Sequence, residues 1–321
     1  MRIAAVIPSW NRRDLLRTLL ENLKAQTKTF DEVIVVDNGS TDGSAEVAES
    51  MGARVVRLPE NLGFAAAVNR GIAPATSEWV AILNNDVTLE PEWLTRMLGA
   101  VGDSAFAAGK ILSAADSKVI DGTFDLMARS GCALRCGAGK RDSPTWNRAG
   151  TISMAPMTAA LFRRSLFEEI GGLDEQFGSY LEDVDFGVRC ALAGRGGVYV
   201  PEAVAHHRGS ATSGKWHSDT VRLLARNQVL LARKYLRGSA RWPVVAGQLL
   251  WGLIACRHGR GFAYLRGKIQ GFRFDLKPFG PSERLQGVNA VLEDSERHIF
   301  ELQRETGWDG YWRVYFWLLR R

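Results

Sequence analysis

Hydrophobic and polar positions in the first hundred residues follow two periods. Four short runs of consecutive apolar residues are typical of strands buried on both faces of a parallel sheet. Between them, apolar residues recur at helical spacing, as at Leu16, Leu19, Leu20 and Leu23. We therefore predict strands at residues 3–7, 32–36, 54–58 and 79–83 and helices at residues 13–26, 45–51 and 64–72.

The pattern between residues 107 and 209 is less regular and richer in glycine. Beyond Trp216 the chain is predicted to be mainly helical. The repeated strand–helix units favour an α/β fold with a mostly parallel sheet flanked by helices, whose ligand lies at the carboxyl ends of the strands. Further elements are predicted as strands at 157–162 and 198–200 and helices at 164–170 and 182–193, the last one closed by Gly194.

Composition excludes two classes of protein. With 46% hydrophobic and 24% charged residues, the chain is neither disordered nor an ordinary multi-span membrane protein. No apolar run reaches the roughly 20 residues that cross a bilayer, and no signal peptide is recognisable. The cysteines lack the paired spacing of a zinc site, so we expect reduced thiols in a cytoplasmic protein; they are Cys132, Cys136, Cys190 and Cys256.

Charge is distributed unevenly along the chain. Residues 220–274 contain eleven Lys or Arg and no Asp or Glu, whereas residues 1–221 contain 27 acids and 23 bases. Such a tract suits anionic lipid head groups, nucleic acid or phosphate-bearing acceptors, and it is also compatible with the solvated face of a helical cap. Because aromatic residues are mixed with the arginines, we favour an anionic membrane surface and expect no nucleic-acid partner. These aromatic residues include Trp242, Trp251, Phe262, Tyr264, Phe272 and Phe274.

Polar clusters follow two of the predicted strands. Asp37 ends the second strand, where a carboxylate can accept a hydrogen bond from a base or a ribose, or can cap the next helix. The tripeptide Asn84-Asn85-Asp86 ends the fourth strand. Its carboxylate and amides can hold a divalent cation that bridges two phosphates, or they can form an ordinary turn. Their equivalent places at strand ends favour a shared site.

The second half offers acids and a histidine. Glu182, Asp183 and Asp185 open a predicted helix. Acids at this position stabilise the helix dipole, but one of them can also take a proton from an acceptor hydroxyl. His207 follows a strand and can bind a metal through its neutral imidazole; a structural role is the alternative, and His206 competes with it.

Read in order, these segments carry a combined motif. It comprises VIPSWNR at 6–12, VVDNGSTDG at 35–43, NLGFA at 61–65, NRG at 69–71, LNNDV at 83–87, IGGLDE at 170–175, YLEDVD at 180–185 and His207. The order closely resembles the inverting family 2 glycosyltransferases of GT-A fold, particularly their bacterial rhamnosyltransferase-like branch. The resemblance implies a nucleotide-sugar-binding half at 1–105, an acceptor-binding half at 106–215 and a basic, aromatic-rich helical C-terminal region at 216–321.

The resemblance also implies residue roles at the donor. Asp37 would contact the base or ribose, and Asn61 and Gly63 would shape the wall near the donor. Asp86 would coordinate Mg²⁺ or Mn²⁺ with His207 near the diphosphate. The nucleotide pocket would further be lined by Pro8, Ser9, Trp10, Asn11, Asn84 and Asn85.

On the acceptor side, the resemblance implies that Asp183 is the general base and that Glu182 helps to bind the acceptor. One position departs from the family, because Asn84 replaces the first acid of the usual Asp-x-Asp motif. A neutral amide is a weaker metal ligand, which leaves Asp86 and the diphosphate oxygens to hold the cation.

The implied activity is transfer of a sugar, with rhamnose favoured, from a nucleoside diphosphate to a glycan or polyprenyl-diphosphate-linked acceptor with inversion. A UDP- or GDP-sugar such as galactofuranose, glucose or mannose would use the same motifs. The implied location is the cytoplasm, on the inner face of the cell membrane. A non-catalytic nucleotide- or sugar-binding protein is the alternative, whereas a dinucleotide oxidoreductase would need a Gly-x-Gly-x-x-Gly segment that the first strand lacks.

Overall fold

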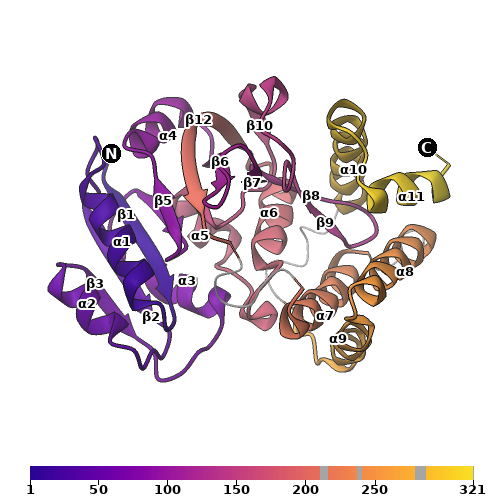
Figure 1. Ribbon diagram of the computed structural model, residues 1–321, viewed down its shortest axis with the longest axis horizontal. Helices are drawn as coiled ribbons and strands as arrows, with labels where there is room; N and C mark the ends of the chain where they lie inside the picture. Colours follow the sequence, from indigo (N-terminus) through magenta and orange to yellow (C-terminus); the bar gives the residue numbers. More distant parts are fainter. Residues whose placement is uncertain (210–215, 237–240, 279–286, 321) are drawn as a thin grey trace.

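A ten-stranded sheet runs through the larger part of the molecule (Figure 1). The computed structural model describes residues 1–209, 216–236, 241–278 and 287–320. The strands are β1 (Ile3–Ser9), β2 (Glu32–Asp37), β3 (Arg54–Arg57), β4 (Trp79–Leu83), β5 (Val87–Leu89), β6 (Phe106–Ser113), β7 (Ile120–Gly122), β10 (Gly150–Ile152), β11 (Ala159–Arg163) and β12 (Gly197–His207). A separate hairpin joins β8 (Asp125–Met127) to β9 (Ala133–Arg135).

The sheet combines a parallel and a mixed half. Its order is β10-β12-β6-β11-β4-β1-β2-β3, with β5 paired to β12 and β7 to β6. Strands β1 to β4 run parallel, and the antiparallel β11 connects β4 to β6. Strand β11 begins at Ala159, two residues later than predicted, because Ala159 lies opposite Leu83 at the end of β4.

Helices cover both faces of the sheet. Alternate residues of a strand point to opposite faces, and β1 accordingly supplies Ile3, Ala5 and Ile7 to one core and Ala4 and Val6 to the other. The first core is closed by α1 (Arg13–Lys24), α2 (Ser44–Ser50) and α4 (Trp93–Val101), and the second by α3 (Phe64–Ile72), α5 (Arg164–Ile170) and α6 (Glu182–Leu192). The fold class and the helices that the pattern predicted are confirmed, with bounds shifted by at most two residues.

The C-terminal part is mainly helical in the residues that the structure describes, as predicted. It lies at the end of the molecule opposite β1, β2 and β3 (Figure 1). None of the described helices is both long and apolar enough to cross a bilayer. The helices are α7 (Ser218–Tyr235), α8 (Arg241–Arg257), α9 (Gly261–Arg273), α10 (Val288–Thr306) and α11 (Gly310–Leu318), and two short 3₁₀ turns lie at η1 (Pro144–Asn147) and η2 (Glu175–Phe177).

Candidate active site

The carboxyl ends of β1 and β2 form one end of the site. Their parallel register places Ser9 beside Asp37, the last residue of each strand. Asp37 is 5% exposed, and its Oδ2 accepts a hydrogen bond from the Ser40 amide at 3.3 Å. Its Oδ1 is buried without a hydrogen-bond partner in the described chain. Because buried polar atoms are rarely left unpaired, this oxygen suits a ligand that donates a hydrogen bond.

The loops after β1 and β2 are tied to each other through Asn11. The Asn11 amide donates to the Ser40 hydroxyl at 3.0 Å, and the Asn11 side chain accepts from the Thr41 amide at 2.8 Å. Asn11 has a φ of 49°, a left-handed conformation that few non-glycine residues adopt. The indole of Trp10, between Pro8-Ser9 and Asn11, remains 40% exposed and presents a face to solvent.

The loop at residues 61–64 connects the end of β2 to the segment just before α6. Asn38 donates to the Asn61 side chain at 3.1 Å and to the Gly63 carbonyl at 3.2 Å. A Cβ on Gly63 would lie 2.8 Å from the carbonyl oxygen of Gly178, so only glycine permits this approach. The Phe64 amide also donates to Ser179 at 3.1 Å. Segments more than a hundred residues apart are thereby joined.

The Asn84-Asn85-Asp86 segment continues the site from β4. The Asn85 side chain donates to the Ser9 hydroxyl at 3.0 Å, and the Asn84 amide donates to the Thr158 carbonyl at 2.9 Å. Asp86 lies directly before β5, which pairs with β12 and places His207 opposite Val87. The Asp86 Oδ1 is consequently 3.1 Å from Nε2 of His207.

The strand geometry distinguishes His207 from His206. Neighbouring residues of β12 point to opposite faces, and His206 approaches Glu90 instead, at 3.5 Å. His207 contacts Asp121 through its other ring nitrogen, with 2.8 Å between Nδ1 and Oδ2. Burial acts to lower the pKa of His207, but hydrogen bonds with Asp121 and Asp86 outweigh it and raise that pKa to about 9.

Asp86 and His207 could supply two ligands of a divalent cation whose remaining ligands come from a substrate. A carboxylate and an imidazole face each other, and Asp121 is placed to orient the imidazole from behind. Within the described residues, no group of three or more His, Cys, Asp or Glu is placed to hold a metal ion. Mg²⁺ typically binds one or two carboxylates and completes its shell with substrate phosphates.

The acid segment begins with two strained residues. Tyr180 and Leu181 have φ values of 73° and 68°, in the left-handed region that costs energy for non-glycine residues. Asn227 of α7 holds this turn, because its side-chain amide donates to the carbonyls of Phe177, Ser179 and Tyr180 at 2.7 to 3.0 Å. The turn sets the direction in which α6 begins.

Two of the three acids on α6 face an arginine and the end of β9. Asp183 Oδ2 is 3.2 Å from Nη2 of Arg135, which also contacts Asp125 and, at 3.2 Å, the Thr158 hydroxyl. Glu182 is 5% exposed, and its Oε2 has no hydrogen-bond partner among the described residues. Burial and the nearby Asp183 raise the pKa of Glu182 well above its usual value. The same surroundings favour the protonated form of Glu182, in which the carboxyl group can donate a hydrogen bond.

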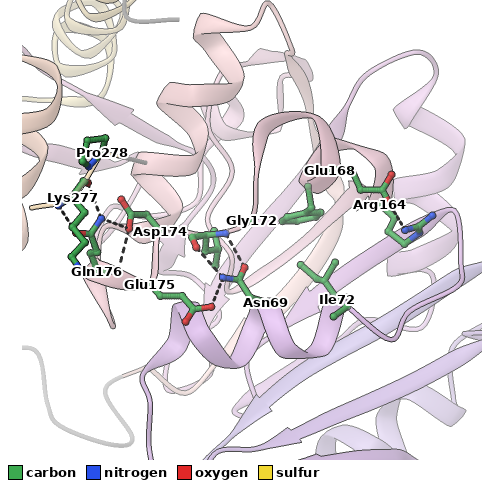
Figure 2. Close-up of a pocket in the computed structure, with 13 residues that line it drawn as sticks. Asn69, Ile72, Arg164, Glu168, Gly172, Asp174, Glu175, Gln176, Lys277 and Pro278 are labelled. Atoms are coloured by element: carbon green, nitrogen blue, oxygen red, sulfur yellow. Dashed lines mark hydrogen bonds and ion pairs between the residues drawn. The ribbon is translucent and has the colours of Figure 1, made fainter. Parts of the chain in front are cut away.

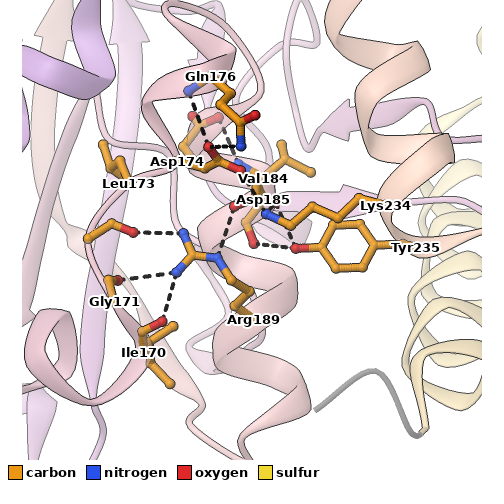
Figure 3. Close-up of polar contacts among 12 residues, drawn as sticks. Ile170, Gly171, Leu173, Asp174, Gln176, Val184, Asp185, Arg189, Lys234 and Tyr235 are labelled. Carbon is orange, nitrogen blue, oxygen red and sulfur yellow. Dashed lines mark hydrogen bonds and ion pairs between the residues drawn. The ribbon is translucent and has the colours of Figure 1, made fainter. Parts of the chain in front are cut away.

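The third acid, Asp185, has a structural role (Figure 3). It is fully buried and contacts Arg189 at 2.9 Å, Lys234 at 2.7 Å and the Tyr235 hydroxyl at 2.7 Å. Lys234 also contacts Asp174 at 3.0 Å. Burial alone would raise the pKa of Asp185, but Arg189 and Lys234 lower it below its usual value. This network fixes α6 against α7.

A groove lies beside this network, and Asp174 is one of its lining residues. It measures about 660 Å³ and lies among α3, α5 and η2 (Figure 2). Asn69 of the NRG motif lines it and binds the Leu173 backbone in both directions, at 2.8 and 2.9 Å. A Cβ on Gly172 would lie 2.6 Å from the Asn69 oxygen. These motif residues thus join the two halves of the fold, and none of the predicted site residues lines the groove.

Contacts run through the predicted site from end to end. Asp37 lies beside Ser9, and the Ser9 hydroxyl accepts a hydrogen bond from Asn85. Asp86, the residue after Asn85, contacts His207. From Asn84 the path continues through Thr158 and Arg135 to Asp183. Sequence reasoning missed three charged neighbours of these residues: Asp121, Asp125 and Arg135.

Comparisons with known proteins agree with this arrangement. Residues 4–171 match the family model Glycosyl transferase family 2. The N-acetylglucosaminyl-diphospho-decaprenol L-rhamnosyltransferase of Mycobacterium tuberculosis is 32% identical over 227 residues, which are 61% of this chain and 73% of that protein. The pre-mycofactocin glycosyltransferase of the same organism is 32% identical over 210 residues, 64% of this chain and 42% of that protein.

Two solved structures share the fold. The mannosyltransferase PcManGT from Pyrobaculum calidifontis, in complex with GDP-Man and Mn²⁺, has a TM-score of 0.53 at 19% identity. The match covers 98% of this chain and 85% of the PcManGT chain. GalNAc-T7 with UDP, GalNAc and Mn²⁺ has a TM-score of 0.65 at 11% identity and covers 96% of this chain and 58% of its own. At these identities the likeness concerns the fold.

Proposed function

Because the chain belongs to glycosyl transferase family 2 and is a glycosyltransferase of GT-A fold, we propose that it transfers rhamnose from a nucleoside diphosphate to a lipid-linked glycan with inversion. Support for the sugar and the acceptor comes from the relative whose name describes rhamnosyl transfer to N-acetylglucosaminyl-diphospho-decaprenol. The observation that carries the proposal is the continuous path of contacts from Asp37 to Asp183.

The donor binds at the carboxyl ends of β1, β2 and β4 in this proposal. The unpaired Oδ1 of Asp37 accepts a hydrogen bond from the base or ribose. Trp10 lies against the base, and Asn61 and Gly63 close the wall of the pocket. Residues 1–105 thus supply most donor contacts, and residues 106–215 supply His207 and the acceptor side.

Asp86 and His207 would hold a Mg²⁺ or Mn²⁺ ion, which neutralises charge on the departing diphosphate. Asn84 and Asn85 lie beside this pair and orient the loop; the Ser9 contact of Asn85 keeps the loop against β1. Asp121 restrains the imidazole through Nδ1, so that Nε2 remains directed at Asp86. Titration of the protein with Mn²⁺ in the presence of a nucleoside diphosphate tests this assignment.

Asp183 removes the proton of the acceptor hydroxyl. The acceptor oxygen forms a bond to the anomeric carbon as the bond to the diphosphate oxygen breaks, and the nucleoside diphosphate leaves. The proton ends on the Asp183 carboxylate. One displacement from the opposite face inverts the anomeric centre. Arg135 holds the carboxylate in place, and Glu182 in its protonated form would donate a hydrogen bond to the acceptor.

The test is a transfer assay with defined donors. dTDP-L-rhamnose, UDP-galactofuranose, UDP-glucose and GDP-mannose are each mixed with Mg²⁺ or Mn²⁺ and a prenyl-diphospho-N-acetylglucosamine acceptor. We expect nucleoside diphosphate release only with acceptor present, fastest with dTDP-L-rhamnose, and a product of inverted configuration by NMR. A faster reaction with another donor would reassign the sugar. Tight nucleotide binding without release under any condition would favour a non-catalytic binding protein.

A further inference from the structure

The α8–α9 hairpin turns its large apolar side chains toward solvent. We define the α8–α9 face by eight residues that are each at least 43% exposed: Trp242, Val245, Leu249, Leu253, Phe262, Leu265, Ile269 and Phe272. They recur at intervals of three or four along each helix, so each helix carries one continuous row. Phe262 is 81% exposed and Phe272 is 70% exposed.

Helix α9 buries glycine and exposes phenylalanine. A Cβ on Gly267 would lie 2.2 Å from the Arg222 carbonyl oxygen, and one on Gly271 would lie 2.7 Å from that of Arg226. The small residues therefore allow α9 to pack closely on α7. An ordinary surface helix buries its large apolar residues. On α9 the large apolar side chains are exposed instead, so they can contact another apolar medium.

The two rows lie on the same side of the hairpin. Contacts pair Cys256 with Gly261, Gly252 with Tyr264, and Gln248 with Lys268, so α8 and α9 run antiparallel. Viewed along each helix from its N-terminus, the exposed row lies about a quarter turn around the helix axis from the residues that contact the other helix. The direction of this rotation is the same for α8 and α9. For antiparallel helices this displacement directs both rows to one face.

Positive charge borders the α8–α9 face. Arg241, Arg257, Arg266 and Arg273 are exposed at its edges. In the described chain no ion pair is recorded for Arg257, Arg266 or Arg273. The sequence from 220 to 274 contains no Asp or Glu, and the exposed Asp275 follows directly after it.

We propose that the α8–α9 face docks the enzyme on an anionic lipid bilayer. Apolar rows entering the interface, with arginines at the level of the head groups, match the chemistry of an interfacial helix. Nucleic acid would use the arginines but not the apolar rows. A second copy of this face would bring arginines against arginines. The proposal goes beyond sugar transfer and does not depend on the identity of donor or acceptor.

Vesicle co-sedimentation of the full chain tests the proposal without any substrate. Vesicles of phosphatidylcholine with phosphatidylglycerol are compared with vesicles of phosphatidylcholine alone. We expect binding to the anionic vesicles only, weakened by salt. Because an arginine near such a surface contributes about fivefold to binding, Arg266→Gln with Arg273→Gln should weaken binding by about 25-fold. Leu249→Ser with Phe262→Ser should weaken it tenfold or more.

Arg17→Gln with Lys28→Gln is the matched charge control, since both residues are exposed on the sheet half of the molecule. All variants replace exposed side chains, and their thermal unfolding should match that of the original chain. Equal vesicle binding by all variants would overturn the proposal, as would the absence of binding by the original chain. A dimer that Phe262→Ser converts to a monomer would assign the face to a second copy instead. Nucleoside diphosphate release with a water-soluble acceptor should persist in each variant, which separates docking from catalysis.

Discussion

The two ends of the site are held in different ways. The end proposed to bind the donor is held, around Asp37, mainly by neutral side chains: Asn11, Asn38, Asn61 and Ser9 bind backbone atoms and neighbouring side chains. The acid end is a set of buried charges linked across α6, α7 and β9. Neutral loops can adapt to a nucleotide, whereas charged side chains buried in pairs keep a fixed geometry. We therefore expect the charged contacts around Asp183 to hold the proposed base more rigidly than the neutral loops hold the proposed donor pocket.

The largest expected effect is on the base itself. Asp183→Asn should lower the transfer rate by about 10² to 10⁴, because a general base contributes on that order. Binding of the nucleoside diphosphate, measured by calorimetry, should remain unchanged. Asp103→Asn, an exposed acid near the far end of α4, serves as control and should transfer normally. Near-normal transfer by the Asp183 variant would mean that another group takes the proton.

The second largest effect is expected at the buried ion pairs of Lys234. Lys234→Met leaves the buried Asp174 and Asp185 without their shared cation (Figure 3). Removing one partner of a buried ion pair costs about 3 to 5 kcal/mol. Urea unfolding should show a loss of this size, whereas the exposed Arg17→Gln should change the free energy of unfolding by no more than about 0.5 kcal/mol. A small effect at Lys234 would mean that the acids find other partners.

The contact between His207 and Asp86 should make the free energy of unfolding depend on pH. The pKa of His207 is raised to about 9 from 6.5. Its proton therefore stabilises the metal-free protein fully below pH 6.5, and this contribution is lost as pH rises toward 9. The full contribution is at most about 3 kcal/mol. Thermal unfolding in EDTA between pH 6 and 10 should show the loss, and Asp121→Asn should reduce it. A profile identical in the variant would contradict the role of Asp121.

The smallest effect should arise at the donor end. Asp37→Asn replaces a charged acceptor with a neutral amide, which should weaken nucleotide binding by about tenfold. Because Oδ1 of Asp37 has no partner in the described chain, the free energy of unfolding should change little. Calorimetry with dTDP, UDP and GDP measures the first quantity, and urea unfolding measures the second. Unchanged affinity for all three nucleotides would remove Asp37 from the donor site.

The residues around Asp37 and Asp86 were easier to select from the sequence than the charged neighbours of Asp183, for a physical reason. Asp37 ends β2 and Asp86 follows shortly after β4, so the apolar runs of these two strands, which flank β1 in the sheet, mark both positions. Arg135 and Asp125 lie on three-residue strands, where no period can be recognised, and Arg135 meets Asp183 across 48 residues of chain. Their charges alone did not distinguish them from solvated side chains.

Geometry separates two pairs of residues that residue type alone does not distinguish. His206 and His207 point to opposite faces of β12, which associates only His207 with Asp86. Asp183 and Asp185 are two residues apart on α6 and face different neighbours: Arg135 for Asp183, and Arg189 with Lys234 for Asp185. Neither distinction follows from residue type. Both follow from the direction in which a strand or helix projects its side chains.

The hydrogen bonds of Asn227 set a limit on the smallest unit that can act as an enzyme. This one amide, on a helix outside the segment that matches the family model, holds three carbonyls in the turn before α6. A chain shortened to end near residue 217 would retain every predicted site residue and lose that support. We therefore expect the smallest active chain to extend through α7, beyond the last recognisable motif residue, His207.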